Sequence, residues 1–418
     1  MRLIGDASIY LGSSIINKVI PFLLLPLLTK YLSPEEYGAL SVYQVLIGFC
    51  IPFVGMQIHI NITRNFNKYS SEELAIWVGN IFFILIASTC MVTILVFLYV
   101  SAGGSNFGVS NNWLIIVPLI GGSTAIHMCY LAVVRSQRRP FAFGLFSISN
   151  TALDMAISLC LIVYFGFGWQ GRGVGIVGSA LFFGLLAVYL LYRQGLCFFR
   201  LNRQKVSEAL KICLPLIPHA LGSAVIYLSD RLFIEQMVGK DAVGIYSISC
   251  TFGMIVSMCV ESFNNAWSPW FYRSMLAADI AVRKRIVKHT YLYFIAVLVL
   301  AVLVSIGSQL VLPLMVSASY HEASQYILLI AIGFACRGMY TIVVPYLIHT
   351  GRTNFLGIGT IATALLNLML NYFMIRANGA IGAAQATLIA FLVQFLITWA
   401  YASKVCPMPW LVWRQRNV

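Results

Sequence analysis

The sequence predicts an all-α integral membrane protein with about 12 transmembrane helices in two six-helix lobes. Three observations carry this prediction: the composition, a series of long apolar runs, and an internal repeat. Of the 418 residues, 60% are hydrophobic and only 10% are charged, and the mean hydropathy is +0.87. Since about a quarter of the residues in a soluble domain are charged, this composition excludes an ordinary soluble domain.

Twelve apolar runs are long enough to cross the roughly 30 Å hydrocarbon core as helices, which takes about 20 residues each. Backbone polar groups in lipid must pair internally, so runs of this length are expected to be helical. The expected spans are 8–30, 38–61, 74–99, 112–134, 142–165, 173–192, 212–237, 242–266, 287–311, 324–347, 355–375 and 381–403.

The second half of the chain repeats the pattern of the first. Ile217–Ser249 contains an apolar helix, a break at Gly239-Lys240-Asp241 and a second apolar helix, and Ile15–Tyr43 does much the same about 206 residues earlier. An offset of 213 then aligns Arg139 with Arg352, Asp154 with Asn367 and Gly166 with Gly379, and an offset of 207 aligns Val174-Gly175 with Ile381-Gly382. This repeat predicts an amino-terminal lobe, 1–200, and a carboxy-terminal lobe, 201–418. Parallel repeats of this kind place a substrate site between the lobes near the bilayer midplane.

The basic residues of the expected loops fall mostly on one side of the membrane. Twenty lie in the amino terminus, every second loop and the carboxy terminus, whereas the opposite side has only Lys30, Arg172, Lys240 and Arg376. The positive-inside rule therefore places both termini in the cytoplasm. The net charge of +14 is mostly a topology signal and an attraction to anionic membrane lipids. A nucleic-acid partner is not expected, because the basic residues form no single stripe.

No enzymatic or metal-binding motif is present. The ten cysteines have no CxxC spacing and lie mostly inside the apolar runs, so neither a disulfide framework nor a zinc site is expected. The sequence contains no HExxH, no GxSxG and no phosphate-binding glycine loop; the glycine-rich stretch 171–175 is expected to be an outer loop with no strand before it. A transporter without a metal or an organic cofactor is therefore expected.

Prolines interrupt the first expected helix of each half: Pro21 and Pro26 in the first, Pro215 and Pro218 in the second. Proline removes a backbone hydrogen bond and bends a helix. Each half is therefore predicted to begin with a bendable helix, as a moving gate requires, although proline is also common in membrane helices for other reasons.

A few charged residues fall at membrane depth, where each costs about 2.5–3.5 kcal/mol and usually faces a cavity or a partner. The cations are Lys18, Arg231 and Arg337, and the acids are Asp154, Asp230, Glu235 and Glu261. Arg231 and Glu235 are four residues apart and would neutralise each other on one helix face. Lys18 and Arg337 have no acid three or four residues onward, so each needs a partner from another helix, such as Asp154 for Lys18, or from a ligand. His219, beside Pro218, is either a proton relay or a packed side chain.

Two motifs resemble a known family: Tyr31-Leu32-Ser33-Pro34-Glu35-Glu36-Tyr37-Gly38 after a first helix, and Asp230-Arg231 followed by Gly244-Ile245-Tyr246-Ser247. They are similar to the bacterial O-antigen-type lipid-linked oligosaccharide flippases of the multidrug/oligosaccharidyl-lipid/polysaccharide (MOP) exporter superfamily. This resemblance implies two lobes in a V around a central cavity and alternating access. The substrate would be an undecaprenyl-diphosphate-linked oligosaccharide that moves from the cytoplasmic to the periplasmic leaflet of the bacterial inner membrane.

The resemblance also implies which residues would do the work. Cations on four helices would contact the diphosphate, and the matching residues here are Lys18, Arg64, Arg231 and Arg337, with Arg64 near or in a cytoplasmic loop. The acids depart from a purely cationic cavity, so Asp154 or Glu261 would carry a proton or sodium ion in exchange, with His219 as a further candidate. Partners would be the lipid-linked substrate, membrane lipids and other glycan-assembly proteins.

Two alternatives stay open. A cation-coupled multidrug exporter of the same superfamily would need an acidic cavity, and Lys18 and Arg337 without local acids argue against it. A membrane polysaccharide polymerase or ligase would carry arginines and histidines in a large outer loop, whereas the longest outer loop expected here, 101–112, is about a dozen residues.

Overall fold

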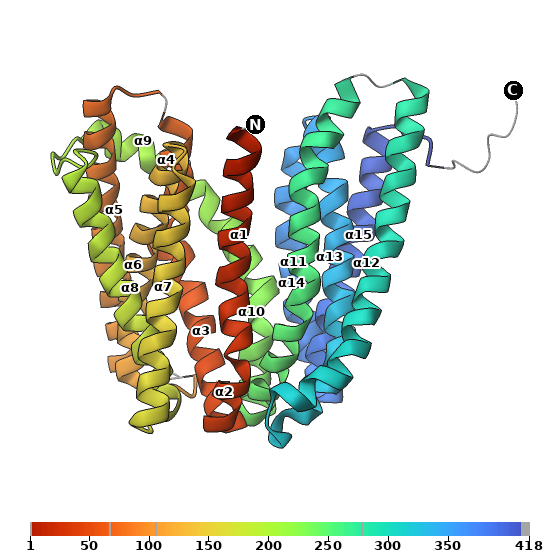
Figure 1. Cartoon of the computed structure of the whole chain (residues 1–418), viewed down its shortest axis with the longest axis horizontal. Helices are drawn as coiled ribbons and strands as arrows, with labels where there is room; N and C mark the ends of the chain where they lie inside the picture. The colour runs from red at the N-terminus through yellow and green to blue at the C-terminus, as the bar shows by residue number, and fades with distance from the viewer. Residues whose placement is uncertain (1, 67, 105–106, 277–278, 411–418) are drawn as a thin grey trace, which may run out of the picture. The chain divides into compact units, whose positions relative to one another are not determined.

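The protein is a bundle of helices in the computed structural model, which describes residues 2–66, 68–104, 107–276 and 279–410 (Figure 1). Within these residues there is no strand, and twelve helices are long and apolar enough to cross a membrane. The all-α prediction and the number of spans are therefore confirmed.

The chain forms two compact units, Met1–Ala224 and Val225–Val418. The helices of the first unit are α1 (Arg2–Leu23), α2 (Leu25–Tyr31), α3 (Pro34–Gly55), α4 (Ile58–Asn65), α5 (Ser71–Ser101), α6 (Asn111–Ser136), α7 (Pro140–Leu159), α8 (Gly168–Arg193) and α9 (Arg203–Cys213). The boundary falls within α10 (Ile217–Met237). The second unit continues with α11 (Lys240–Leu276), α12 (Ile280–Met315), α13 (Ser324–His349), α14 (Thr353–Asn378) and α15 (Ala380–Val405). The sequence interpretation divided the chain at residue 200, but α9 packs against α4 and α5 and is therefore part of the first unit.

Local sequence determines where several helices begin. Ser33 caps α3 by accepting a hydrogen bond from the Glu36 amide, and the Glu36 carboxylate in return accepts one from the Ser33 amide. Ser70 and Glu73 form the same reciprocal cap on α5. Each cap satisfies two backbone donors that would otherwise lack a partner.

The prolines interrupt both helices in which the sequence predicts a bend. The first span is broken at Leu24, between α1 and α2, beside Pro21 and Pro26. Before α10, residues Leu214–Leu216 form one turn of 3-10 helix around Pro215. In both cases the missing proline N–H removes a bond from the regular ladder.

The backbone turns support the internal repeat. Gly166 and Gly379, aligned by the offset of 213, both have φ of 66°. The same offset aligns Arg138, with φ of 55°, and Gly351, with φ of 72°, each two residues before the start of α7 or α14. Few residues of a chain have a positive φ. Its recurrence at two pairs of aligned positions indicates that the corresponding loops of the two units have the same backbone conformation.

Two segments differ from the sequence interpretation. Residues 171–175, expected as an outer loop, lie in the first turns of α8, where Gly173 packs against Trp113. Residues 267–276 and 280–286, outside the expected spans 242–266 and 287–311, are the ends of α11 and α12, which extend past the apolar runs. Hydropathy identifies the part of a helix that crosses lipid, and a helix continues beyond it wherever its backbone stays paired.

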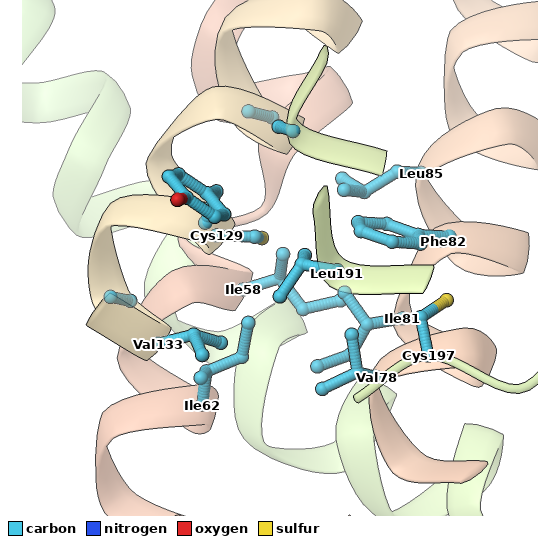
Figure 2. Close-up of a cluster of buried hydrophobic side chains, with 14 of the residues drawn as sticks. Ile58, Ile62, Val78, Ile81, Phe82, Leu85, Cys129, Val133, Leu191 and Cys197 are labelled. Carbon is cyan, nitrogen blue, oxygen red and sulfur yellow. The ribbon is translucent and has the colours of Figure 1, made fainter. Parts of the chain in front are cut away.

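Each unit has its own apolar core. In the first unit the core joins α4, α5, α6 and α8, with side chains that include Ile58, Phe82, Cys129 and Leu191 (Figure 2). In the second unit α13 packs closely against α15, where a Cβ added at Gly333 would lie 3.5 Å from the Leu388 Cα. Small residues let membrane helices approach closely, and the resulting van der Waals contact drives their association.

The segment between α8 and α9 is bonded to α5. The Phe198 amide donates to the Ala75 carbonyl (2.9 Å), and Asn80 Nδ2 donates to the Arg200 carbonyl (2.9 Å). The Asn202 amide donates back to Asn80 Oδ1 (2.8 Å). The segment approaches so closely at Gly79 that a Cβ there would overlap the Phe198 carbonyl.

Gly79→Ala is therefore expected to lower the free energy of unfolding by about 1–3 kcal/mol, the usual cost of overpacking. Thermal unfolding in detergent micelles would measure the change. Gly357→Ala in α14 is the matched control, because no atom lies within 4 Å of its added Cβ. Equal unfolding temperatures for the two variants would contradict the expected overlap.

Candidate functional site

Two of the predicted cations of the second unit meet at one tyrosine. The Arg337 guanidinium on α13 lies 4.2 Å from the ring centre of Tyr227 on α10, and 5.8 Å from that of Phe391 on α15. Arg231 Nη1 on α10 donates to the Tyr227 carbonyl (3.0 Å). Arg231 and Arg337, far apart in sequence, are thus brought to the same residue.

Arg231 belongs to a network with an internal counter-charge. Its Nη1 lies 3.4 Å from Asp230 Oδ1, and its Nε donates to Ser247 Oγ on α11 (3.3 Å). The Tyr246 hydroxyl donates to Asp230 Oδ2 (2.6 Å). The sequence suggested Glu235 as the partner of Arg231, whereas the ion pair found is with the adjacent Asp230. Arg231 reaches Asp230 while also bonding the Tyr227 carbonyl one turn back.

Arg337 has no such counter-charge within the described residues. Among the described residues, its guanidinium forms neither a hydrogen bond nor an ion pair, and its partners are the two aromatic rings. Arg337 is partly buried near the middle of α13. A cation over an aromatic face is stabilised by about 0.5–2 kcal/mol, yet all five N–H donors stay available. This arrangement suits an anionic ligand whose oxygens accept hydrogen bonds from these donors.

Lys18 and Arg64 belong to the first unit and differ in setting. Lys18 is partly buried within the apolar span Gly12–Tyr31. The adjacent Asn17 fixes α1 against α7, because Asn17 Nδ2 donates to Ser147 Oγ (2.6 Å) and Asn17 Oδ1 accepts from Thr151 Oγ1 (3.0 Å). Lys18 therefore sits on a helix whose rotation is held by hydrogen bonds.

Arg64 is exposed on α4, outside the twelve candidate spans. The sequence interpretation ran a single helix over 38–61, but Met56 and Gln57 both adopt left-handed conformations (φ 46° and 54°), which end α3 and start α4 in a new direction. A hydropathy average does not detect such a turn, because it contains no information on backbone conformation.

Asp154, the first ion-coupling candidate, is held in a buried ion pair. Its Oδ1 bonds Arg172 Nη1, and Arg172 Nη1 also donates to Ser158 Oγ (2.9 Å). Arg172 is only 6% exposed, although the sequence interpretation placed it in an outer loop. The early start of α8 is what brings this arginine to α7.

The other two ion-coupling candidates are exposed. Glu261 lies on the surface of α11, and His219 lies in the first turn of α10, where its carbonyl accepts a hydrogen bond from Ser223 Oγ (3.1 Å). Neither candidate has the burial of Asp154.

One polar cluster in the second unit was missed from the sequence. Asn367 and Asn371 on α14 are fully buried, and Asn367 Oδ1 accepts from Ser229 Oγ (3.2 Å) and from Asn371 Nδ2 (3.1 Å). Within the described part of the chain, Asn367 Nδ2, Asn371 Oδ1 and Thr387 Oγ1 have no hydrogen-bond partner. The repeat offered a signal, because it aligns Asn367 with Asp154: both units carry a polar residue at this position, buried in the second unit and partly buried in the first.

The cysteines and the other possible metal ligands are dispersed through the described part of the chain. No cluster of three or more His, Cys, Asp or Glu in the described ranges could hold a metal ion. All ten cysteines are free thiols. Burial raises the pKa of the Cys197 thiol, between α8 and α9, to about 12, so this thiol stays protonated and unreactive at neutral pH.

Solved structures of similar fold are membrane transporters. The chain aligns with a lipid II flippase, MurJ, in an inward closed conformation, with a TM-score of 0.70, 13% identity, and coverage of 96% of this chain and 87% of the other. A Vibrio cholerae MATE transporter gives a TM-score of 0.63 at 15% identity, covering 96% of both chains. An inward-facing MATE transporter of the MOP superfamily gives 0.60 at 13% identity, covering 93% and 94%. At these identities the likeness concerns the fold, which is that expected from the sequence motifs.

Sequence comparisons identify the family. Protein 1 of the Lsg locus of Haemophilus influenzae is 24% identical over 367 residues, covering 85% of this chain and 87% of the relative. An uncharacterised membrane protein of the same organism is 24% identical over 381 residues, covering 88% and 89%. The family model for polysaccharide biosynthesis proteins matches residues 3–275. Because this match spans more than half of the 418 residues, the chain belongs to the polysaccharide biosynthesis protein family.

Proposed function

We propose that this protein is a flippase that moves an undecaprenyl-diphosphate-linked oligosaccharide, a repeat unit of O-antigen or a related surface polysaccharide, from the cytoplasmic to the periplasmic leaflet of the bacterial inner membrane. It works by alternating access, and the apolar lipid tail stays in the bilayer while the head group crosses. Family membership supports the substrate class, and the lipid II flippase among the structures of like fold supports the transport of a lipid-linked substrate.

The observation that carries the proposal is Arg337, a cation at membrane depth without a carboxylate partner among the described residues. An unpaired charge in lipid is costly and usually marks a substrate path. A diphosphate that enters the bilayer loses its water, and fixed N–H donors replace it. An arginine guanidinium can donate two parallel hydrogen bonds to two oxygens of one phosphate. Arg231 and Lys18 are proposed as further contacts, and the exposed Arg64 as an entry contact at the membrane surface.

We further propose that a proton or sodium gradient drives the cycle, with Asp154, Glu261 and His219 as the coupling candidates. Asp154 leads because its carboxylate is partly buried, whereas Glu261 and His219 are exposed; it accepts a hydrogen bond from Arg172 Nη1, which also donates to Ser158 Oγ. Orientation with both termini in the cytoplasm rests on the asymmetry of 20 against four basic loop residues. Other glycan-assembly proteins are the proposed partners.

A cation-coupled multidrug exporter is the second candidate, since MATE transporters share the fold. A cavity for cationic drugs needs acids that are free to bind them. In the described part of the chain, Asp230 is bonded to Tyr246 and Arg231, and Asp154 is bonded to Arg172. These pairings favour the anionic substrate.

Reconstituted liposomes test the proposal. Purified protein is mixed with a short undecaprenyl-diphosphate oligosaccharide, and a membrane-impermeant glycan-modifying enzyme measures how much glycan becomes exposed. We expect protein-dependent exposure that is faster with an imposed proton or sodium gradient. No exposure with either gradient, together with uptake of a cationic dye that depends on Asp154 or Glu261, would instead establish the exporter.

A further inference from the structure

Helix α9, which follows α8 and precedes α10, is held to the first unit by one of its faces. Ala209 and Cys213 on this face are buried, and Asn61 Nδ2 donates to the Ala209 carbonyl (3.3 Å) and to Cys213 Sγ (2.9 Å). Lys205 Nζ lies 4.5 Å from the ring centre of Tyr69 and donates to the Glu73 carbonyl (3.4 Å). The helix is therefore a fixed part of this unit.

A second face of α9 forms a groove of about 460 Å³, within the roughly 300–1,000 Å³ of small-molecule sites. Its lining combines apolar Leu201, Val206, Leu210 and Leu214 with the cations Arg203 and Lys211. Leu201 is 63% exposed and Leu214 is 50% exposed. Steps of three, four and seven residues from Arg203 through Leu210 to Leu214 place these side chains along one side of the helix.

The charge around this groove is positive and nearly unopposed. The segment from Arg193 to Lys211 contains five basic residues and one acid, Glu208, and Glu208 accepts a hydrogen bond from Gln204 (3.2 Å). The candidate membrane span that includes α10 begins at Arg203, the first residue of α9, so the groove lies at the end of a membrane-crossing segment. An apolar stripe flanked by cations at this depth is typical of a helix in the bilayer interface.

We propose that the α9 groove, lined by Leu201, Arg203, Val206, Ser207, Leu210, Lys211 and Leu214, binds one anionic glycerophospholipid of the surrounding bilayer. The phosphate lies between Arg203 and Lys211, and an acyl chain follows the leucines. Inorganic phosphate would leave the apolar part of the groove empty, and a zwitterionic headgroup would gain less from the two cations. The site is independent of the transport function, since it involves neither Arg231 nor Arg337.

Photocrosslinking tests the proposal directly. The full-length protein in phosphatidylcholine nanodiscs receives a small fraction of phosphatidylglycerol with a photoactivatable group on its acyl chain, and mass spectrometry locates the labelled peptides. We expect labelling within residues 201–214 that unlabelled phosphatidylglycerol displaces at roughly tenfold lower concentration than phosphatidylcholine, given about 1 kcal/mol per basic residue near the surface.

Two variants separate a built site from general attraction. Arg203→Ala/Lys211→Ala removes the charges and should lower labelling roughly tenfold, while Ser207→Phe fills the groove without changing charge and should lower it as much. The matched control is Arg285→Ala/Lys288→Ala, which removes two exposed charges from α12 and should leave labelling unchanged. The substituted residues of all three variants are exposed, and thermal unfolding checks that each folds.

Three results would overturn the proposal. One is labelling by Ser207→Phe at the wild-type level, and another is an equal loss in the α12 control, which would indicate only diffuse attraction to a positive surface. The third is displacement by an undecaprenyl diphosphate at lower concentration than by phosphatidylglycerol, which would assign the groove to the transported lipid.

Discussion

Arg337→Ala is expected to lower the initial rate of glycan exposure in the liposome assay by roughly ten- to hundredfold, the worth of hydrogen bonds to a charged group. The folded protein should be little affected, because the described residues include no carboxylate that the substitution would leave unpaired near Arg337. Arg337→Lys keeps the charge but loses the planar fork and its stacking on Tyr227, so it should fall between the wild type and the alanine variant.

The control for this experiment is Arg376→Ala on α14, an exposed arginine of the same unit that donates a long hydrogen bond to the Tyr372 hydroxyl (3.5 Å). It should transport at the wild-type rate. Tyr227→Leu supplies a second test, because it removes the ring beneath Arg337 and keeps an apolar side chain. Full activity in Arg337→Ala would remove the central support for a diphosphate path.

Arg172→Ala is expected to lower the free energy of unfolding by about 3–5 kcal/mol, because it leaves the Asp154 carboxylate without its buried partner. Asp154→Leu should be similarly costly, since it leaves the Arg172 guanidinium unpaired. The double variant Asp154→Leu/Arg172→Met replaces both charges by apolar groups and should recover most of the loss. Thermal unfolding in detergent would measure all three, with the exposed Arg193→Ala on α8 as control.

The double variant also separates two roles for Asp154. If the ion pair only stabilises the fold, the double variant in liposomes should transport with the same response to a proton or sodium gradient as the wild type. A stable double variant whose transport no longer responds to the gradient would instead place coupling at Asp154. If the loss of unfolding free energy in the double variant equals the sum of the losses in the two single variants, the two residues do not interact, and the ion pair is contradicted.

The internal repeat connects these two predictions. Asp154 on α7 and Asn367 on α14 are aligned by the 213-residue offset, and both sit in buried polar clusters. In the first unit the cluster contains an ion pair, whereas in the second it contains amides and hydroxyls. The aligned helices therefore share a polar position that differs in its chemistry. Arg337, which has no carboxylate partner among the described residues, lies elsewhere, on α13.

The bulk of the fold was determined by the sequence itself. A bilayer of fixed thickness requires long apolar helices with paired backbones, so the apolar runs located twelve spans, and the prolines near Leu24 and Leu214 marked the breaks. The repeat was likewise readable, since Gly166 and Gly379 must supply the same positive φ. Candidate cations could be named from sequence because charges at membrane depth are rare.

Only the tertiary structure decided which of these charges are already satisfied. Arg172 became the partner of Asp154 because α8 starts at Gly168, and Arg337 meets Tyr227 across 110 positions of sequence. Helix α9 joined the first unit through Asn61, far from it in the chain. Hydropathy averages over a helix and contains no information on its rotation or its neighbours, whereas ion pairs and stacking depend on side-chain directions that packing alone sets.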